Sequence, residues 1–84
     1  MKDKILIKLA VPEIEEEYDI YIPINKKIGN VIKLLNKAVF ELSNGLYVGS
    51  TKNFLYDSET GTKYDLNAII KDTNVRNGSR VVLF

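Results

Sequence analysis

Two stretches near the start of the chain alternate between apolar and polar positions, which is the pattern of extended strands. The first carries Ile5, Ile7 and Leu9 on one face. It ends at Val11-Pro12, because proline cannot donate a hydrogen bond to a neighbouring strand. The second follows a polar connection and covers residues 18–23. Two alternating runs joined by a short polar loop predict an antiparallel β-hairpin.

The next stretch carries apolar residues about 3.5 positions apart, which predicts an amphipathic helix of roughly 18 residues. Asn25 is the predicted N-cap, because its side-chain oxygen can accept a hydrogen bond from a free amide of the first turn. Asn44-Gly45 is predicted to end the helix, with glycine in the left-handed position that follows a helix end. The apolar positions are Ile28, Val31, Ile32, Leu35, Val39 and Leu42.

The opposite face of this helix carries lysines, at Lys26, Lys33 and Lys37. We interpret it as a solvated face, with docking of an acidic partner as the alternative. Phe40 lies on the same side, away from the apolar stripe. We expect residues 46–48 to fold back and cover Phe40, whereas a bare Phe40 would be a contact residue.

The remaining sequence predicts short elements. Residues 46–48 form either a short strand or an ordered loop, and residues 53–56 form a strand with residues 62–64 as a short partner. Asn77-Gly78 then turns the chain into a closing strand at residues 80–84. The connection before that turn contains about one helical turn and is expected to bury Leu66, Ile69, Ile70 and Val75.

The order of these elements is a hairpin, a long helix, and two or three further strands. The helix has one apolar stripe, and the inner face of a sheet is the surface available to cover it. We therefore predict an α+β fold in a single domain over residues 1–84, with the helix packed across a mixed sheet of four or five strands.

Several residues resemble positions in ubiquitin and its β-grasp relatives. Leu66, Val75 and Asn77-Gly78 match a spacing in which a leucine opens the late connection, and an aliphatic residue and a turn precede the last strand. Ile28-Gly29-Asn30-Val31 resembles the start of the ubiquitin helix. The resemblance implies a ubiquitin-like β-grasp fold in which the C-terminal strand is central.

Within that superfamily the chain is most similar to the EsaB/YukD-type small ubiquitin-like proteins. Their hallmark is an Asn-Gly or Asp-Gly turn before a short final strand with no tail, as in residues 77–84. Those proteins are bacterial cytosolic components associated with type VII (WXG100) secretion systems. The resemblance implies a non-catalytic adaptor that binds a protein component of such a secretion system and acts as a component or regulator of that system.

Composition narrows the possible chemistry. The 84 residues include no cysteine and no histidine, which excludes disulfides, a thiol nucleophile, an ordinary zinc site and an imidazole base. Twelve basic and eleven acidic residues leave a net charge of +1, unlike the basic field that nucleic-acid binding needs. No apolar run approaches the ~20 residues of a membrane span. We expect a cytoplasmic protein that is no enzyme and binds a protein partner, with no cofactor, no nucleic acid and no membrane insertion, as a monomer or weak homodimer.

Two clusters of carboxylates lie in predicted turns, at residues 15–17 and at Asp57 and Glu59. Acid–base catalysis needs a carboxyl group whose pKa is shifted by burial or by a close partner. A solvated turn supplies neither, so we interpret both clusters as structural.

The C-terminal residues bear on covalent attachment. Modifiers and sulfur carriers of this fold end in a flexible Gly-Gly tail, because an activating enzyme must reach the terminal carboxylate through a narrow channel. This chain ends in Val82-Leu83-Phe84, inside the predicted strand. We therefore expect no conjugation. The alternatives are a modifier or sulfur carrier processed from a longer precursor, and a small structural subunit or homodimer.

The outer face of the predicted sheet is the candidate binding surface. If Ile5, Ile7, Phe54, Tyr56, Val81 and Leu83 point toward the helix, alternation turns four apolar residues away from it. Such an apolar patch often marks a protein-binding surface. The resemblance to ubiquitin-like folds puts Leu55 at the centre of the patch, and Lys8 and Arg80 add a polar rim. The predicted apolar residues are Leu6, Leu55, Val82 and Phe84.

Overall fold

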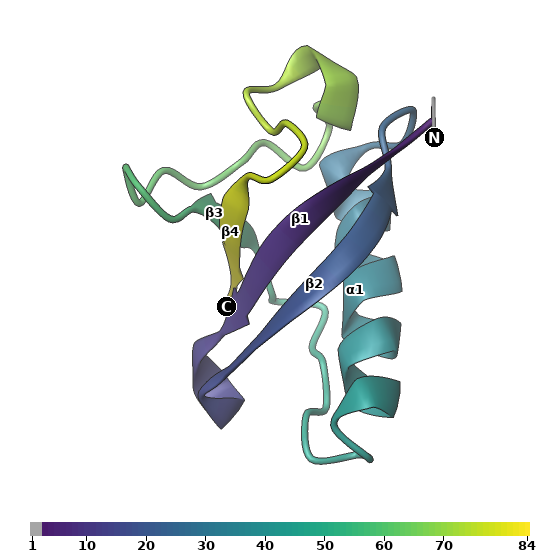
Figure 1. Ribbon diagram of the computed structural model, residues 1–84, viewed down its shortest axis with the longest axis vertical. Helices are drawn as coiled ribbons and strands as arrows, with labels where there is room; N and C mark the ends of the chain where they lie inside the picture. The colour runs from purple at the N-terminus through teal and green to yellow at the C-terminus, as the bar shows by residue number, and fades with distance from the viewer. Residues whose placement is uncertain (1–2) are drawn as a thin grey trace.

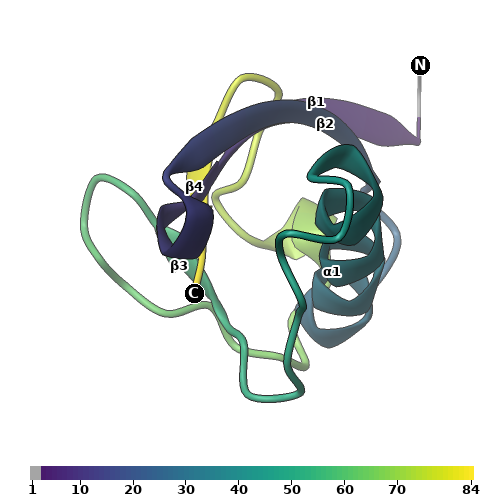
Figure 2. The ribbon, with the colours of Figure 1, turned by 90° about the horizontal axis from the view of Figure 1, so that it is seen from below.

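The computed structural model describes residues 3–84 and shows one mixed sheet with one α-helix against it (Figure 1). The four strands lie in the order β2-β1-β4-β3. Seen along the helix, β1 and β2 curve over one side of it, and the long segment after the helix returns along another side (Figure 2). The predicted α+β architecture is confirmed.

The predicted hairpin is present as β1 (Lys4–Val11) and β2 (Glu16–Pro23), paired antiparallel along their whole length. The two strands are joined by a 3-10 helix at Pro12–Ile14. Glu15 follows it with a left-handed backbone (φ 54°), which lets the chain reverse direction. Ile7, Leu9 and Val11 are buried, so the predicted inner face of the first strand is correct.

The last strand, β4 (Arg80–Leu83), lies between β1 and β3 (Leu55–Asp57). It runs parallel to β1, with Lys8 opposite Arg80, and antiparallel to β3. The C-terminal strand is therefore an inner strand of the sheet, as the resemblance implied.

The helix α1 (Ile28–Leu42) buries the predicted apolar positions from Ile28 to Val39, but Leu42, in its last turn, is 55% exposed, contrary to expectation. The N-terminus of the helix also differs from the prediction. Lys27 is the N-cap residue and no side chain caps the helix, so the expectation for Asn25 is wrong. The amides of Ile28 and Gly29 instead donate to the carbonyl oxygens of Ala68 and Leu66, at 2.8 and 3.0 Å. Backbone groups from a distant connection thus satisfy the first turn.

The C-terminus of α1 closes locally. Asn44 adopts a left-handed backbone (φ 55°), and its N–H donates to the carbonyl oxygen of Glu41 at 3.2 Å. The N–H of Gly45 donates to the carbonyl oxygen of Phe40 at 2.8 Å. This pair of bonds is a Schellman motif with Asn44 in the first left-handed position. The predicted end of the helix is confirmed, with asparagine where glycine was expected.

The segment after α1 is an ordered loop. Tyr47 is buried, and its hydroxyl donates to Asn36 Oδ1 at 3.1 Å. The amide group of Asn36 donates in turn to the carbonyl oxygen of Ser50 at 3.3 Å, which holds the loop against the helix. Leu46 and Val48 point outward and are 71% and 69% exposed. Strand β3 begins at Leu55, two residues later than predicted.

The connection between β3 and β4 matches the prediction in part. Lys63 pairs with Tyr56 through a single bridge, and one 3-10 turn at Ile70–Asp72 follows. Ile70 and Val75 are buried, but Leu66 is 41% exposed, contrary to expectation. The carbonyl oxygen of Leu66 accepts a hydrogen bond from the Gly29 amide at the helix N-terminus, and the Leu66 side chain remains at the surface. Among residues 3–84, no helix is long and apolar enough to span a membrane.

Candidate functional site

The outer face of the sheet is the face turned away from α1, and the pairing of β3 with β4 decides which residues it carries. Val81 and Leu83 are buried against the helix, so Val82 takes the outer face. Leu55 lies directly opposite Leu83 and is fully buried. The prediction that Leu55 is the centre of an exposed patch is therefore wrong. Opposite residues in a ladder share a face, and a shift of one residue reverses every side chain.

The same register moves two aromatic side chains to the outer face. Tyr56 lies opposite Val82, and Phe54 exchanges backbone hydrogen bonds of 2.9 and 3.1 Å with Phe84. Phe54 and Tyr56 were expected to point toward the helix, and both are instead half-buried on the outer face. Phe84 is 65% exposed. We call Phe54, Tyr56, Val82 and Phe84 the aromatic patch.

Charged and small side chains border the aromatic patch. The Lys63 ammonium lies 4.2 Å from the centre of the Phe54 ring, a cation–π contact. Ala10 lies beside Val82 on β1 and extends the apolar surface. One step along the same strands, Lys8 is paired with Arg80 in register, as the predicted rim requires. Lys8 also forms an ion pair with Asp19 at 3.6 Å.

Two predicted contact residues lie outside the aromatic patch. Leu6 is on the outer face, but it is four residues from Ala10, about 13 Å along the strand. Its backbone bonds to Asn77 and Gly78, so the last turn lies beside it in place of β4. Phe40 is on the helix and is 47% exposed. Residues 46–48 do not cover it, because Tyr47 turns into the core while its neighbours point outward.

A polar cluster stands beside this face, at the end of β3. The Asn74 amide donates to Asp57 Oδ2 at 3.0 Å, and the Tyr64 hydroxyl donates to Asn74 Oδ1 at 2.7 Å. The bond from Asn74, followed by backbone N–H groups of Glu59 and Thr60, lowers the pKa of Asp57 below its usual value. Desolvation, followed by the charge of Asp57, raises the pKa of the Tyr64 hydroxyl. These bonds tie the Asp57 turn to the residues before β4.

No charged side chain within residues 3–84 is buried. The same residues contain no group of three or more histidine, cysteine, aspartate or glutamate side chains placed to hold a metal ion.

Sequence reasoning missed Phe54, Tyr56 and Lys63 as surface residues. The run Phe54-Leu55-Tyr56 is apolar throughout, so hydrophobicity alone does not say which parity faces the core. One available signal was the tyrosine hydroxyl, which is easier to place at a surface than a leucine side chain.

Comparison with known proteins finds solved structures of similar shape. No protein-family model matches the sequence, and no curated protein matches it. The structure is similar to the ubiquitin-like domain of EccD5 from Mycobacterium xenopi, with 17% identity, 96% of this chain and 92% of that chain covered, and a TM-score of 0.69.

Two further solved structures show the same shape. The ubiquitin-like domain of the Mycobacterium tuberculosis type VII secretion system protein ECCD1 is 11% identical, with 95% of this chain and 96% of that chain covered and a TM-score of 0.73. A structure described as molecular mimicry of SUMO that promotes DNA repair is 17% identical, with 98% of this chain and 91% of that chain covered and a TM-score of 0.74. The strand order, the single helix and these matches together establish that the chain has the ubiquitin-like β-grasp fold.

Proposed function

We propose that this protein is a ubiquitin-like binding module that docks a partner protein through the aromatic patch and carries out no catalytic step of its own. The observation that carries the proposal is the pairing of β3 with β4, which sets Phe54 opposite Phe84 and Tyr56 opposite Val82 on the outer face of the sheet. The backbone of the patch is hydrogen-bonded between the two strands, so its side chains are already placed before a partner binds.

The chemistry of the patch suits a protein interface. Aromatic side chains are enriched in such interfaces and often supply most of the binding energy. Removal of apolar area from water contributes roughly 25 cal/mol per Å² before the entropy cost of association is subtracted, and Phe84, which is 65% exposed, has much area to bury. Lys63 and Arg80 stand at the rim, where charge favours a partner with acidic groups around its own apolar anchor.

We further infer that the partner belongs to a bacterial type VII secretion system and that docking takes place in the cytoplasm. Two features support this inference. The chain shares its fold with the ubiquitin-like domains of EccD5 and ECCD1, and its Asn77-Gly78 turn before a short final strand resembles the EsaB/YukD-type proteins.

Affinity capture from cells of the source organism, with crosslinking and identification of captured proteins by mass spectrometry, tests both inferences. The patch variant carries Phe54→Ser and Phe84→Ser, and the matched control carries Leu46→Ser and Val48→Ser at exposed positions away from the sheet. We expect the wild type and the control to capture a secretion-system component and the patch variant to lose it.

Equal capture by the two variants would contradict the assignment of the patch. A patch-dependent partner with no connection to secretion would contradict the inferred system but not the docking surface. If the purified wild type self-associates on concentration and the patch variant does not, the patch is a homodimer interface instead.

A further inference from the structure

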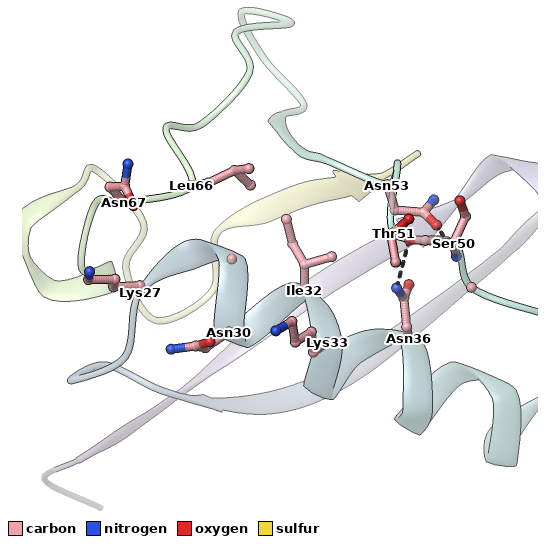
Figure 3. A pocket seen from close by; sticks show the side chains of 12 residues that line it. Lys27, Asn30, Ile32, Lys33, Asn36, Ser50, Thr51, Asn53, Leu66 and Asn67 are labelled. Carbon is pink, nitrogen blue, oxygen red and sulfur yellow. Dashed lines mark hydrogen bonds between the residues drawn. The ribbon is translucent and has the colours of Figure 1, made fainter.

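A second surface lies on the other side of the fold, between α1 and the loops that face it. It is a groove of about 470 Å³ that runs along the first half of the helix. The helix side carries Lys27, Asn30 and Lys33, and the far side is formed by Gly49–Thr51 and by Leu66 (Figure 3). We call this the lysine groove.

Hydrogen bonds fix the walls of the lysine groove at both ends. At one end the Leu66 carbonyl oxygen accepts from the Gly29 amide at 3.0 Å, and a Cβ added at Gly29 would lie 3.3 Å from that oxygen. At the other end Asn36 donates to Ser50, and a Cβ added at Gly49 would overlap the Asn36 side chain. The two glycines permit these close approaches because they lack a side chain. Between the two contact points the helix and the facing loops are further apart, and the groove lies there. The groove is therefore formed before any ligand arrives.

The floor of the groove is apolar. Ile32 is 5% exposed and points from the helix into the space between the walls (Figure 3). Leu66 extends toward the same space from the facing connection, and it is one of the large apolar side chains left at the surface. An aliphatic or aromatic side chain placed between Ile32 and Leu66 would contact both, and the apolar area that it buries would come mainly from Leu66, which is 41% exposed.

The charge of the groove has one sign. Lys27 and Lys33 are the charged residues that line it, and no carboxylate does. The ion pair found within residues 3–84 is Lys8–Asp19, so neither groove lysine is neutralised by an ion pair there. The helix amides add no open donors at this end, because Ile28 and Gly29 already bond to the facing connection.

Unused amide groups complete the lining. The side chains of Asn30 and Asn67 make no hydrogen bond with any residue of the described range, 3–84, and both line the groove. Each offers two donors and an acceptor, which suits the N–H and C=O groups of an extended peptide backbone. A small inorganic anion would use the lysines but leave the apolar floor uncovered.

We propose that the lysine groove binds an acidic peptide segment of a partner protein. An aliphatic or aromatic side chain of that segment packs between Ile32 and Leu66, and carboxylates beside it lie at Lys27 and Lys33. The proposal does not depend on the aromatic patch, which is on the opposite side of the sheet from the helix.

Selection from a displayed library of random short peptides tests the proposal on the full chain. We expect enrichment of sequences in which aspartate or glutamate flanks leucine, isoleucine or phenylalanine. A selected peptide, labelled with fluorescein, is then titrated by fluorescence anisotropy. The double variant Lys27→Glu, Lys33→Glu should bind it about tenfold more weakly or worse, because two attractions become repulsions. Leu66→Ser should also weaken binding severalfold.

The matched control is Lys37→Glu, Lys71→Glu, which changes the net charge equally at exposed positions outside the groove. It should retain most of the wild-type affinity, and circular dichroism should show all variants folded. High salt should weaken wild-type binding, because the lysines are exposed. Replacing the acidic residues of the peptide with glutamine should weaken it too.

Several results would overturn the proposal. These are no enrichment of acidic peptides, equal weakening by the groove and control variants, and equal affinity for the glutamine peptide. Tight binding of labelled single-stranded DNA that the groove variant loses would assign the lysines to nucleic acid instead. Self-association that only the groove variant loses would make a second copy of this chain the occupant.

Discussion

Two neighbouring pairs of facing residues, one from each of the segments that pair at β3 and β4, lie on opposite faces of the sheet. Leu55 and Leu83 face each other in the core and are almost completely buried. One residue away, Phe54 and Phe84 also face each other, yet they lie on the outer face, and Phe84 is 65% exposed. All four side chains are strongly apolar, so hydrophobicity does not separate them.

The difference between the two pairs comes from register. The core takes up whichever set of alternate residues the pairing with β4 turns toward α1, and the other set is left at the surface. Apolar residues in the surface set have no internal partner to cover them. Their presence on two adjacent strands therefore favours a binding surface over an incidental exposed residue.

The largest expected effect on stability comes from truncating one side chain of each pair to alanine. Leu55→Ala should lower the free energy of unfolding by about 2–5 kcal/mol, because it leaves a cavity in the core. Phe84→Ala should lower the free energy of unfolding by at most about 1 kcal/mol, which is the contribution of one cross-strand side-chain pair. Urea unfolding followed by circular dichroism measures both. Equal losses, or a greater loss for Phe84→Ala, would contradict the assignment of the two faces.

A second prediction contrasts these exposed aromatics with Tyr47, an aromatic side chain inside the fold. Tyr47→Phe removes the hydrogen bond to Asn36 and should cost about 0.5–1.5 kcal/mol at neutral pH. Burial, assisted by the charge of Glu13, raises the pKa of the Tyr47 hydroxyl in the folded state. The folded protein then holds this proton more tightly than the unfolded chain does.

The stability linked to that proton is complete below the unfolded pKa of about 10 and is lost as the pH rises through the folded pKa. Urea midpoints measured from neutral to strongly alkaline pH should therefore fall more steeply for the wild type than for Tyr47→Phe. Parallel curves for the two proteins would show that Tyr47 is not the group responsible.

The smallest expected effect concerns Asp57, which has the inner-face parity of Leu55 but lies at the end of the sheet. Its carboxylate is stabilised by Asn74 and by turn amides, so its pKa is lowered in the folded state. That stabilisation is present above the unfolded pKa of about 3.9 and is lost as the pH falls through the folded pKa. Asp57→Asn should lose less stability than the wild type on acidification below about pH 4.

Asn74→Ala offers a second measurement of the same effect, because Asn74 makes the largest contribution to the lowered pKa. The Asn74→Ala variant should also lose less folding stability than the wild type as the pH falls. Urea unfolding midpoints across the acidic range measure that loss. An unchanged acid profile in both variants would show that the cluster does not couple folding to pH.

The two ends of α1 show why some elements are readable in the sequence and others are not. The hydrogen bonds that end the helix at its C-terminus join residues a few positions apart, and the Asn44-Gly45 pair is a local sequence signal for that end. The N-terminus is closed by carbonyl groups about forty positions further along, at Leu66 and Ala68. No local pattern contains that information, so the choice of Asn25 as cap was reasonable by propensity and still wrong.

The candidate site divides in the same way. Lys8 could be placed on the outer face from the alternation along β1, which has eight residues, and the parity assumed for the closing strand placed Arg80, Val82 and Phe84 there correctly. Strand β3 has three residues, too few for alternation to define its faces, so Leu55 was assigned to the wrong one. The lysine groove was not predicted, because its walls meet only after residues distant in sequence fold together.

Sequence alone determined the hairpin, the amphipathic helix, the closing strand and the α+β class, because each depends on periodicity or on a turn a few residues long. Tertiary structure alone decided which aromatics face solvent, what caps the helix and where the lysines line a hollow. These features depend on pairing register and on contacts between remote segments, and a linear pattern of apolar and polar residues specifies neither.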